Sequence, residues 1–366
     1  MQKLRILLIL LAFSHLGQAQ DIPYTSCPNC WNSDSLGNHR AVIRFDGIDN
    51  IVHARIPWRL PIADPFNHHI IVQDAQTGEL IKSDIAFADR ESGDIFFKPT
   101  SGKGIYYAYY LPYRNEGRSN YPKGIYQKPD TAANIPTITK INSTVSSFQS
   151  IDTFNTFYPM EVIATAKETS KLKAKYPNKP FLLFPEDREH PIRMQTDLPL
   201  RWIEQSPSIS AIADIGEYFT FQIGVYALKD LKDIRLSFNA PFPITCVNTT
   251  GVTYDGHPFT NQINITKDHI QPLWCGIDIP KSAARGTYLV KVTVMPKNAR
   301  PETVSFRLQT TFRYAADGGD PKKMTHLKWL NSTLAQENTV IAPYTPLSIQ
   351  GDTLINLLGR SIQLSP

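Results

Sequence analysis

The chain has 366 residues, of which 42% are hydrophobic and 19% are charged, and its formal net charge is +5 at pH 7. This length suits two or three domains of roughly 100 to 200 residues each and allows a sizeable core. Removing residues 1–19 takes away Lys3 and Arg5 and lowers the net charge from +5 to +3. So small and dispersed a charge argues against nucleic acid as a partner.

Residues 1–19 have the features of a secretory signal peptide. Lys3 and Arg5 form a charged start, residues 6–13 form an apolar run, and residues 17–19 end it with small side chains. The apolar run is far shorter than the ~20 residues that cross a bilayer, which favours a signal over a membrane anchor. We expect an exported protein, located in the periplasm, at the cell surface or outside the cell, with no membrane span after signal removal.

The sequence predicts an all-β protein with two β-sandwich domains joined by a linker and one helix. The first sandwich is expected at residues 20–120, where short strand-like segments follow one another without helices between them. These segments are residues 41–45, 51–58, 69–75, 95–99 and 104–113. In the last of them, alternate side chains point to opposite faces, so one face should join the core and the other should carry surface tyrosines.

Residues 121–210 are expected to form a linker, a helix and a proline-rich crossover. Residues 121–156 are rich in Pro, Ser, Thr and Asn and lack periodicity, which is typical of a linker. The helix is predicted at residues 159–175, with Pro159 at its first position and lysines in its last turn. Three further prolines argue against a long regular element in residues 182–202: Pro185, Pro191 and Pro199.

The crossover carries a dense cluster of charged residues, in which Glu186, Asp187 and Glu189 lie beside Arg188 and His190. One hypothesis makes Glu186 and Asp187 the acid and base of a glycosidase. The other makes the cluster a set of ion pairs that holds the crossover in place. Structural ion-pair networks occur as well as catalytic ones, and the second hypothesis is favoured. Glu186 and Asp187 therefore stand as weak catalytic candidates.

A second sandwich is predicted at residues 211–314. Its clearest segment is residues 274–294, WCGIDIPKSAARGTYLVKVTV, in which apolar side chains recur at every second position on both sides of Pro280. Residues 315–366 should contain a hinge-like linker and the start of an incomplete third β module, with Gly351 and Asp352 in a hairpin turn.

Four cysteines in an exported chain favour disulfides. We expect Cys27 to pair with Cys30 and Cys246 with Cys275, because each pair falls within one module; two free buried thiols at Cys246 and Cys275 are the alternative. No metal site and no cofactor are expected. Sequons for glycosylation occur at Asn142, Asn248, Asn264 and Asn331.

Several phrases resemble a known family. Residues 274–294 resemble the domain that precedes the catalytic barrel in glycoside hydrolase family 123, with matching positions at Trp274, Pro280, Ala283, Gly286, Tyr288, Val292 and Val294. Residues 216–227, GEYFTFQIGVYA, resemble an early strand of that domain through Glu217, Phe221 and Gln222. With FPEDREHPIRM, YYLPYRNEGRSNYPK and the tail that begins HLKWLNSTL, the likeness spans most of the mature chain.

The resemblance implies a partner rather than a site within these residues. In the family, a (β/α)8 barrel removes β-linked N-acetylgalactosamine by a substrate-assisted route, aided by an adjacent Asp-Glu pair on the barrel. Here Glu186 precedes Asp187, the reverse order, and both lie ahead of the second sandwich, so the catalytic roles are not transferred to them. The expected function is a non-catalytic accessory region, supporting a catalytic barrel supplied in cis or from a neighbouring gene.

Two alternatives remain open at this stage. The chain can be a stand-alone carbohydrate-binding or adhesion protein, with a glycan or glycoconjugate as partner and aromatic side chains stacking on sugar rings. The aromatic candidates for this role are Trp58, Trp202, Tyr106 and Tyr110. The second alternative is a hydrolase that uses Glu186 and Asp187.

Overall fold

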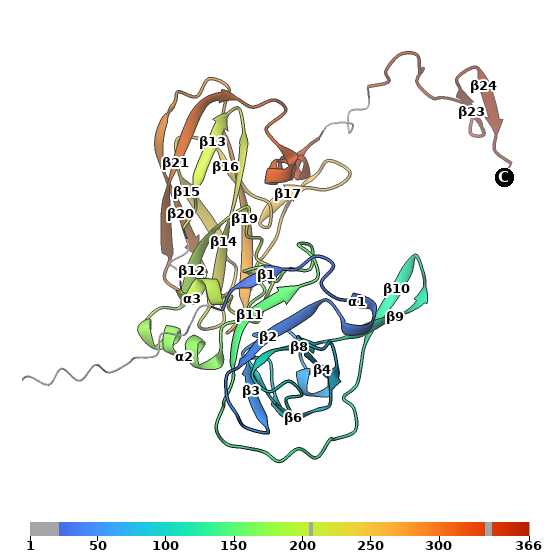
Figure 1. Ribbon diagram of the computed structural model, residues 1–366. Coiled ribbons are helices and arrows are strands. Elements are labelled where there is room, and N and C mark those ends of the chain that lie inside the picture. The colour runs from blue at the N-terminus through green and yellow to red at the C-terminus, as the bar shows by residue number, and fades with distance from the viewer. Residues whose placement is uncertain (1–21, 205–207, 334–338, 366) are drawn as a thin grey trace, which may run out of the picture. The chain divides into compact units, whose positions relative to one another are not determined.

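The computed structural model describes residues 22–204, 208–333 and 339–365, and it separates into two compact units (Figure 1). The first unit comprises residues 1–172 and 197–203, and the second comprises residues 173–196 and 204–366. Strands dominate both units, which confirms the all-β prediction. The predicted signal at residues 1–19 lies outside the described residues. Among the residues described, no helix is both long enough and apolar enough to cross a membrane.

The first unit is built on two facing sheets. The larger has the strand order β1-β11-β2-β8-β4-β5, and the smaller has the order β3-β7-β6. Their bounds are β1 Tyr24–Ser26, β2 His39–Phe45, β3 Val52–Ile56, β4 Ile70–Asp74, β5 Leu80–Ile81, β6 Ser83–Ala88, β7 Gly93–Phe97, β8 Gly104–Tyr110 and β11 Thr144–Ser150. The core between the sheets takes alternate side chains from each, among them Ile43 and Tyr106 from one and Ile56 and Ile95 from the other.

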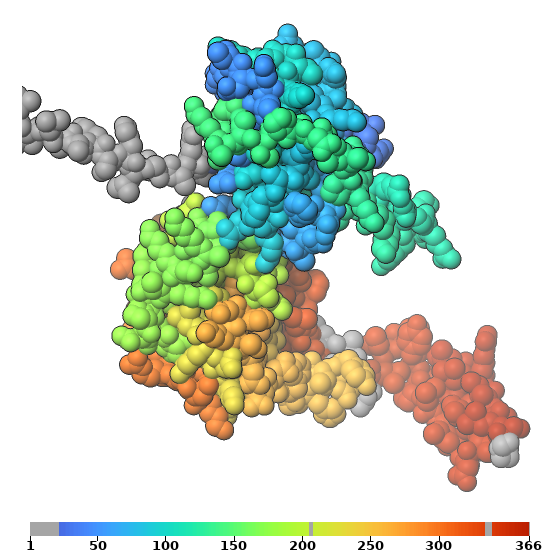
Figure 2. Space-filling model, turned by 90° about the horizontal axis from the view of Figure 1, so that it is seen from below, coloured from blue at the N-terminus to red at the C-terminus, as the bar shows by residue number. Residues whose placement is uncertain are grey.

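Strand β11 corrects the predicted boundary at residue 120. Residues 144–150 were expected in a linker, yet they pair in parallel with β1 and antiparallel with β2, inside the large sheet. The segment alternates poorly in hydrophobicity because its register shifts between Val145 and Ser147, and only Phe148 and Ser150 are buried. The predicted boundary at residue 120 also falls inside a hairpin. Its strands, β9 Tyr113–Arg118 and β10 Tyr121–Tyr126, are largely exposed, and the hairpin projects from the unit (Figure 2).

Helix α2 begins later than predicted, at Ala166, and ends at Lys175. The cause is a capping box: the Thr165 hydroxyl accepts the Glu168 backbone N–H at 3.2 Å, and the Glu168 carboxylate accepts the Thr165 N–H at 2.8 Å. Glu168 also forms a bidentate pair with Arg59 at 2.8 and 2.9 Å. Met160, within the range predicted as helix, is buried in the turns that precede α2. Up to residue 204, the other helical segments are short: α1 Ser33–Leu36, η1 Pro65–Asn67 and α3 Leu200–Glu204.

The second unit is a sandwich of two four-stranded sheets. Their orders are β12-β14-β19-β16 and β13-β21-β20-β15. The bounds are β12 Phe181–Asp187, β13 Ala211–Ile215, β14 Tyr218–Ala227, β15 Arg235–Asn239, β16 Ile244–Cys246, β19 Ile270–Asp278, β20 Gly286–Met295 and β21 Glu302–Tyr314. A small hairpin, β17 Thr250–Val252 with β18 Pro258–Thr260, is attached to it. β12 passes through Pro185, against the prediction, because it is an edge strand whose proline need not donate to a neighbour.

The alternating segment of residues 274–294 has the predicted buried faces. Leu273, Cys275 and Ile277 in β19 and Val290 and Val292 in β20 are at most 1% exposed. The two strands belong to opposite sheets, so the Pro280 turn carries the chain across the sandwich rather than around a hairpin.

Residues 315–331 are part of this sandwich and not a hinge. The Tyr218 N–H donates to Gly318 O at 2.8 Å, and the Thr220 hydroxyl donates to Lys323 O at 3.0 Å. Two 3-10 helices follow, η2 Pro321–Lys323 and η3 Thr325–Asn331, where an opening strand had been expected. Further on, β22 Ser348–Gln350, β23 Leu354–Leu357 and β24 Arg360–Gln363 form a three-stranded meander with the predicted turn at Gly351.

Candidate functional site at the end of strand β12

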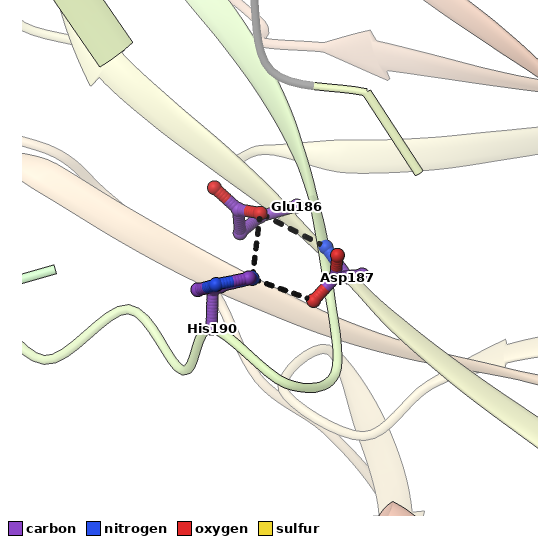
Figure 3. Close-up of side chains that lie close together, drawn as sticks. All are labelled: Glu186, Asp187 and His190. Carbon is purple, nitrogen blue, oxygen red and sulfur yellow. Dashed lines mark hydrogen bonds and ion pairs between the residues drawn. The ribbon is translucent and has the colours of Figure 1, made fainter. Parts of the chain in front are cut away.

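The charged cluster predicted from the sequence forms where β12 leaves its sheet. β12 pairs antiparallel with β14, so Glu186 lies opposite Gln222 and Asp187 opposite Phe221. The chain then turns, and His190 returns toward both acids. Figure 3 shows the three side chains Glu186, Asp187 and His190 converging. Their ligand-type atoms all lie within 4.8 Å of one another.

The three side chains hydrogen-bond to one another and to backbone N–H groups of the same turn. His190 Nδ1 lies 2.9 Å from Asp187 Oδ1 and 3.6 Å from Glu186 Oε1. The Asp187 backbone N–H donates to Glu186 Oε1 at 3.3 Å, and the Glu189 N–H donates to Asp187 Oδ1 at 2.9 Å. Glu186 is fully buried, whereas the side chains of Asp187 and His190 are 18% and 24% exposed. The turn is thus held by its own acidic side chains.

Gln222 fixes the same turn from the neighbouring strand. Its Nε2 donates to the backbone oxygens of Asp187 at 2.9 Å and His190 at 3.1 Å, and its Oε1 accepts the Ile192 N–H at 2.8 Å. The side chain is fully buried. Three backbone groups that would otherwise lose their hydrogen bonds on burial are therefore satisfied by one amide.

Arg188 and Glu217 add a buried ion pair beside the turn. Arg188 Nη1 lies 2.6 Å from Glu217 Oε1, and the side chains are 8% and 4% exposed. Glu217 Oε2 accepts the Asp214 N–H at 2.9 Å, and the Arg188 guanidinium stacks 4.7 Å from the centre of the Phe219 ring. The pair lines a polar pocket of about 250 Å³ within the second unit.

The geometry fits a structural role better than glycosidase chemistry. The carboxylate oxygens of Glu186 and Asp187 lie within 4.8 Å of each other. Retaining glycosidases separate their two carboxyl groups by about 5 to 5.5 Å and inverting ones by about 6.5 to 9.5 Å, with a sugar between them. Glu186 has no exposed surface on which a sugar ring could lie. The hypothesis that the charged residues hold the crossover in place is the one these contacts favour.

The cluster also has the donor set of a cation site, one imidazole nitrogen and two carboxylate oxygens. An ion at about 2.0 to 2.5 Å from each ligand would hold those atoms roughly 3 to 4 Å apart, near the distances found here. The same atoms are already engaged with one another and with backbone N–H groups. We assign no ion to them, because these hydrogen bonds account for the arrangement.

The four aromatic candidates for carbohydrate binding lie in the interior. Trp58, Trp202, Tyr106 and Tyr110 are 2%, 3%, 0% and 1% exposed. Trp58 donates its indole N–H to Asp89 O at 2.7 Å, and Tyr106 donates its hydroxyl to Gly102 O at 2.7 Å. Burial raises the pKa of Tyr110 well above its ordinary value. These rings belong to cores and present no open face to a sugar, which corrects their proposed role as a platform.

The cysteines follow the prediction in part. Cys27 and Cys30 form a disulfide. Cys246 and Cys275 are free buried thiols, which corrects the predicted second disulfide, although the two residues are direct partners on β16 and β19. Of the sequon residues, Asn142, Asn248 and Asn264 accept backbone N–H groups through their side-chain oxygens.

The pairing of strands brings together three segments that are distant in the sequence, and this was not predicted. The phrases around Glu186, Gln222 and Trp274 lie on three adjacent strands, β12, β14 and β19, with Gln222 opposite both of the others. Glu217 and Gln222, quoted for a resemblance, are the residues that hold the crossover. A signal was present: a Gln inside an otherwise apolar ten-residue strand must find partners for its amide.

Comparison with known proteins gives one family. Residues 29–155 match "Glycoside hydrolase 123, N-terminal domain". This match spans strands β2 to β11 and includes the quoted segment YYLPYRNEGRSNYPK. The resemblance stated for residues 216–227 and 274–294 lies outside the match and stays a prediction. No curated protein matches the chain.

Among solved structures, a family 123 glycoside hydrolase from Clostridium perfringens, described for its glycolipid glycan hydrolysis, is 13% identical. The likeness covers 38% of this chain and 28% of that protein, with a TM-score of 0.29. The family resemblance of this chain rests on residues 29–155, which are similar to the N-terminal domain of glycoside hydrolase family 123.

Proposed function

We propose that this chain is a non-catalytic accessory region of an exported, glycoside hydrolase-related protein that acts on glycans. The observation that carries the proposal is the burial of Glu186 within a turn closed by its own hydrogen bonds. That acid and Asp187 were the residues on which a hydrolase hypothesis rested. Their contacts supply scaffolding, and the family match supplies the connection to glycan hydrolysis.

The meander supports the second part of the proposal, a catalytic partner. Its apolar side chains are exposed on a small sheet, with Ile349 at 72%, Leu358 at 49% and Ile362 at 48% exposure. A three-stranded sheet without a covered face is only marginally stable alone. We assign this face to a catalytic barrel supplied in cis or by a neighbouring gene, and we expect that barrel to take glycans that contain N-acetylgalactosamine.

A turnover assay separates scaffold from enzyme. The full chain is incubated with a chromogenic β-N-acetylgalactosaminide, beside the variant Glu186→Gln and the matched exposed variant Glu189→Gln. We expect no turnover by any of the three. Turnover that is lost in Glu186→Gln and retained in Glu189→Gln would overturn the proposal and assign hydrolysis to the cluster.

The partner and the export are tested on the native protein. Intact mass of the protein recovered from its own cells is expected to show removal of residues 1–19. The same sample, separated by size, is expected to carry a barrel domain, either covalently or as a companion chain. A species that retains Met1 and carries no barrel in either form would contradict these parts of the proposal.

A further inference from the structure

Cys246 and Cys275 lie in a geometry that suits thiol exchange. They are direct partners on antiparallel strands β16 and β19. The Val247 N–H donates to Trp274 O at 3.0 Å and the Asp278 N–H donates to Pro243 O at 3.0 Å, so hydrogen-bonded pairs alternate along the ladder and leave Cys246 opposite Cys275 at a non-hydrogen-bonded position. At such positions Cα atoms are about 4.5 Å apart, within the range of about 4.4 to 6.8 Å that a disulfide spans.

The two thiols are chemically different. Hydrogen bonding from the Cys275 thiol above all lowers the pKa of Cys246 to about 7, against the opposing effect of burial, and hydrogen bonding at Asn248 and Thr249 acts in the same direction as Cys275. Burial raises the pKa of Cys275 well above its ordinary range. Near neutral pH, Cys246 is therefore the nucleophilic partner, because the thiolate is the attacking species.

A pocket lies against Cys246, which is 2% exposed, whereas Cys275 lies behind it and does not line the pocket. It has a volume of about 600 Å³ and lies within the second unit along the edge strands β15 and β16 of the two sheets. Cys246 lines it together with apolar Leu236, Phe238 and Ile244, and Thr250 and Thr260 line it from the β17–β18 hairpin. Its volume falls within the range of roughly 300 to 1,000 Å³ common for small-molecule sites. The pocket is thus large enough for a low-molecular-weight disulfide.

We propose that Cys246 is a thiol-exchange site, which low-molecular-weight disulfides reach through this pocket and which Cys275 resolves. The Cys246 thiolate attacks one sulfur of the incoming disulfide, forms a mixed disulfide and releases one thiolate. Cys275 then loses its proton to solvent and attacks the Cys246 sulfur, which expels the second thiolate. The net change oxidises two protein thiols to one cross-strand disulfide and reduces one small disulfide to two thiols.

The charged and titratable groups that face Cys246 are few among the described residues. Cys275 faces it from β19, while the Tyr218 hydroxyl lies on the other face of the sheet, where it shares a hydrogen bond of 2.9 Å with Thr245. Asp233 and Arg235 line the pocket from the side of β15. The first release of thiol should therefore rise with pH with a midpoint of about 7, the pKa of Cys246.

A chromogenic aromatic disulfide, dithio-bis-nitrobenzoate, tests the proposal on the folded full chain. We expect the wild type to release two coloured thiols per chain and keep no adduct. Cys275→Ser should release one and retain the adduct on Cys246 by peptide mass mapping. Cys246→Ser should react at least about tenfold more slowly, because the remaining thiol is buried and stays protonated.

Two controls keep the outcomes distinct. The double variant Cys27→Ser, Cys30→Ser removes the other sulfur pair and should behave as the wild type. Near-ultraviolet circular dichroism of each variant establishes that it is folded before the reaction. Wild-type reaction only in denaturant, or a Cys246→Ser rate equal to that of the wild type, would overturn the proposal.

Discussion

Strand β14 and the meander β22–β24 show opposite relations between apolar sequence and burial. All ten residues of β14 are buried, since β12 and β19 flank it and the facing sheet covers it. The strands of the meander also contain apolar residues, among them Ile349 and Ile362, yet every residue of β22 and β24 is exposed. Both β14 and the meander strand β23 have neighbours on either side in their sheets, but only β14 has a second sheet packed against it. In this chain, an apolar strand is therefore buried where another sheet covers its face, and pairing within a sheet is not enough.

The largest expected loss of stability comes from a substitution in the buried strand β14. Phe221 is fully buried and packs edge to face with Phe306 at 5.0 Å between ring centres. Phe221→Ala should lower the free energy of unfolding of the second unit by about 3 to 5 kcal/mol, because it removes apolar contacts and leaves a cavity. Urea denaturation followed by amide exchange in β14 measures it. A loss below about 1 kcal/mol would mean that β14 is not the centre of this core.

The buried ion pair comes next. Glu217→Ala leaves the Arg188 guanidinium 8% exposed and without this carboxylate, which should lower stability by roughly 3 kcal/mol. The double variant Glu217→Leu, Arg188→Met removes both charges and should recover much of that loss. Denaturant unfolding of the three proteins measures the pattern, and an equal loss in single and double variants would contradict it.

Gln222 offers a smaller and more local test. Gln222→Ala removes three hydrogen bonds to the backbone of the crossover and should lower the free energy of unfolding by about 1 to 3 kcal/mol. The loosened segment should also exchange the Ile192 amide faster. Exchange measured by mass spectrometry is expected to rise in residues 187–194 and to remain unchanged in the meander.

The next prediction concerns the pH dependence of stability that comes from Asp94 in strand β7. A bidentate hydrogen bond from Arg55, at 2.8 and 2.6 Å, lowers the pKa of Asp94 in the first unit, despite partial burial. Because the folded pKa lies below the unfolded one, this stability is present above about pH 4 and is lost as pH falls through the folded pKa. The thermal midpoint of the wild type should therefore fall more steeply than that of Asp94→Asn between about pH 5 and 2. Parallel curves would contradict the prediction.

The smallest effect belongs to the meander. Ile349→Ser changes a side chain that is 72% exposed and should shift the stability of either unit by less than about 0.5 kcal/mol. The same change should weaken association with the proposed catalytic partner, measured by co-purification. A stability loss comparable to that of Phe221→Ala would show that the meander is covered by the chain itself.

The sequence predicted the strands whose alternation is regular and missed those held by irregular pairing. β8, β19 and β20 were predicted from their period-two pattern, and β2, β3, β4 and β7 from short strand-like segments that follow one another without helices. β11 was missed because a register shift breaks its alternation, and the helix start was misplaced because the Thr165 and Glu168 capping box was overlooked. Each miss has a local cause in hydrogen bonding rather than in hydrophobicity.

The candidate site was predictable in location but not in character. The many charged residues near Glu186 and Asp187 in the sequence predicted that a site would form in the crossover, and a structural role was the favoured interpretation. The partner residues Gln222 and Glu217 lie about 30 positions away in the chain, so only the strand register reveals them. Likewise, alternation assigned Tyr106 and Tyr110 to one face of β8 but left open which face was buried.

The parallel pairing of β11 with β1 sets how this protein must be shortened or expressed in pieces. β1 has β11 as its neighbour in the sheet, and β2 relies on β11 at one edge. A fragment ending at residue 120 would leave β1 without a partner and expose the edge of β2. Exposed strand edges pair with other chains, so we expect such a fragment to aggregate. Since residues 24–26 meet residues 148–150 across more than a hundred positions, the first unit also has high contact order and should fold slowly. A usable fragment of this region therefore has to retain residues 144–150.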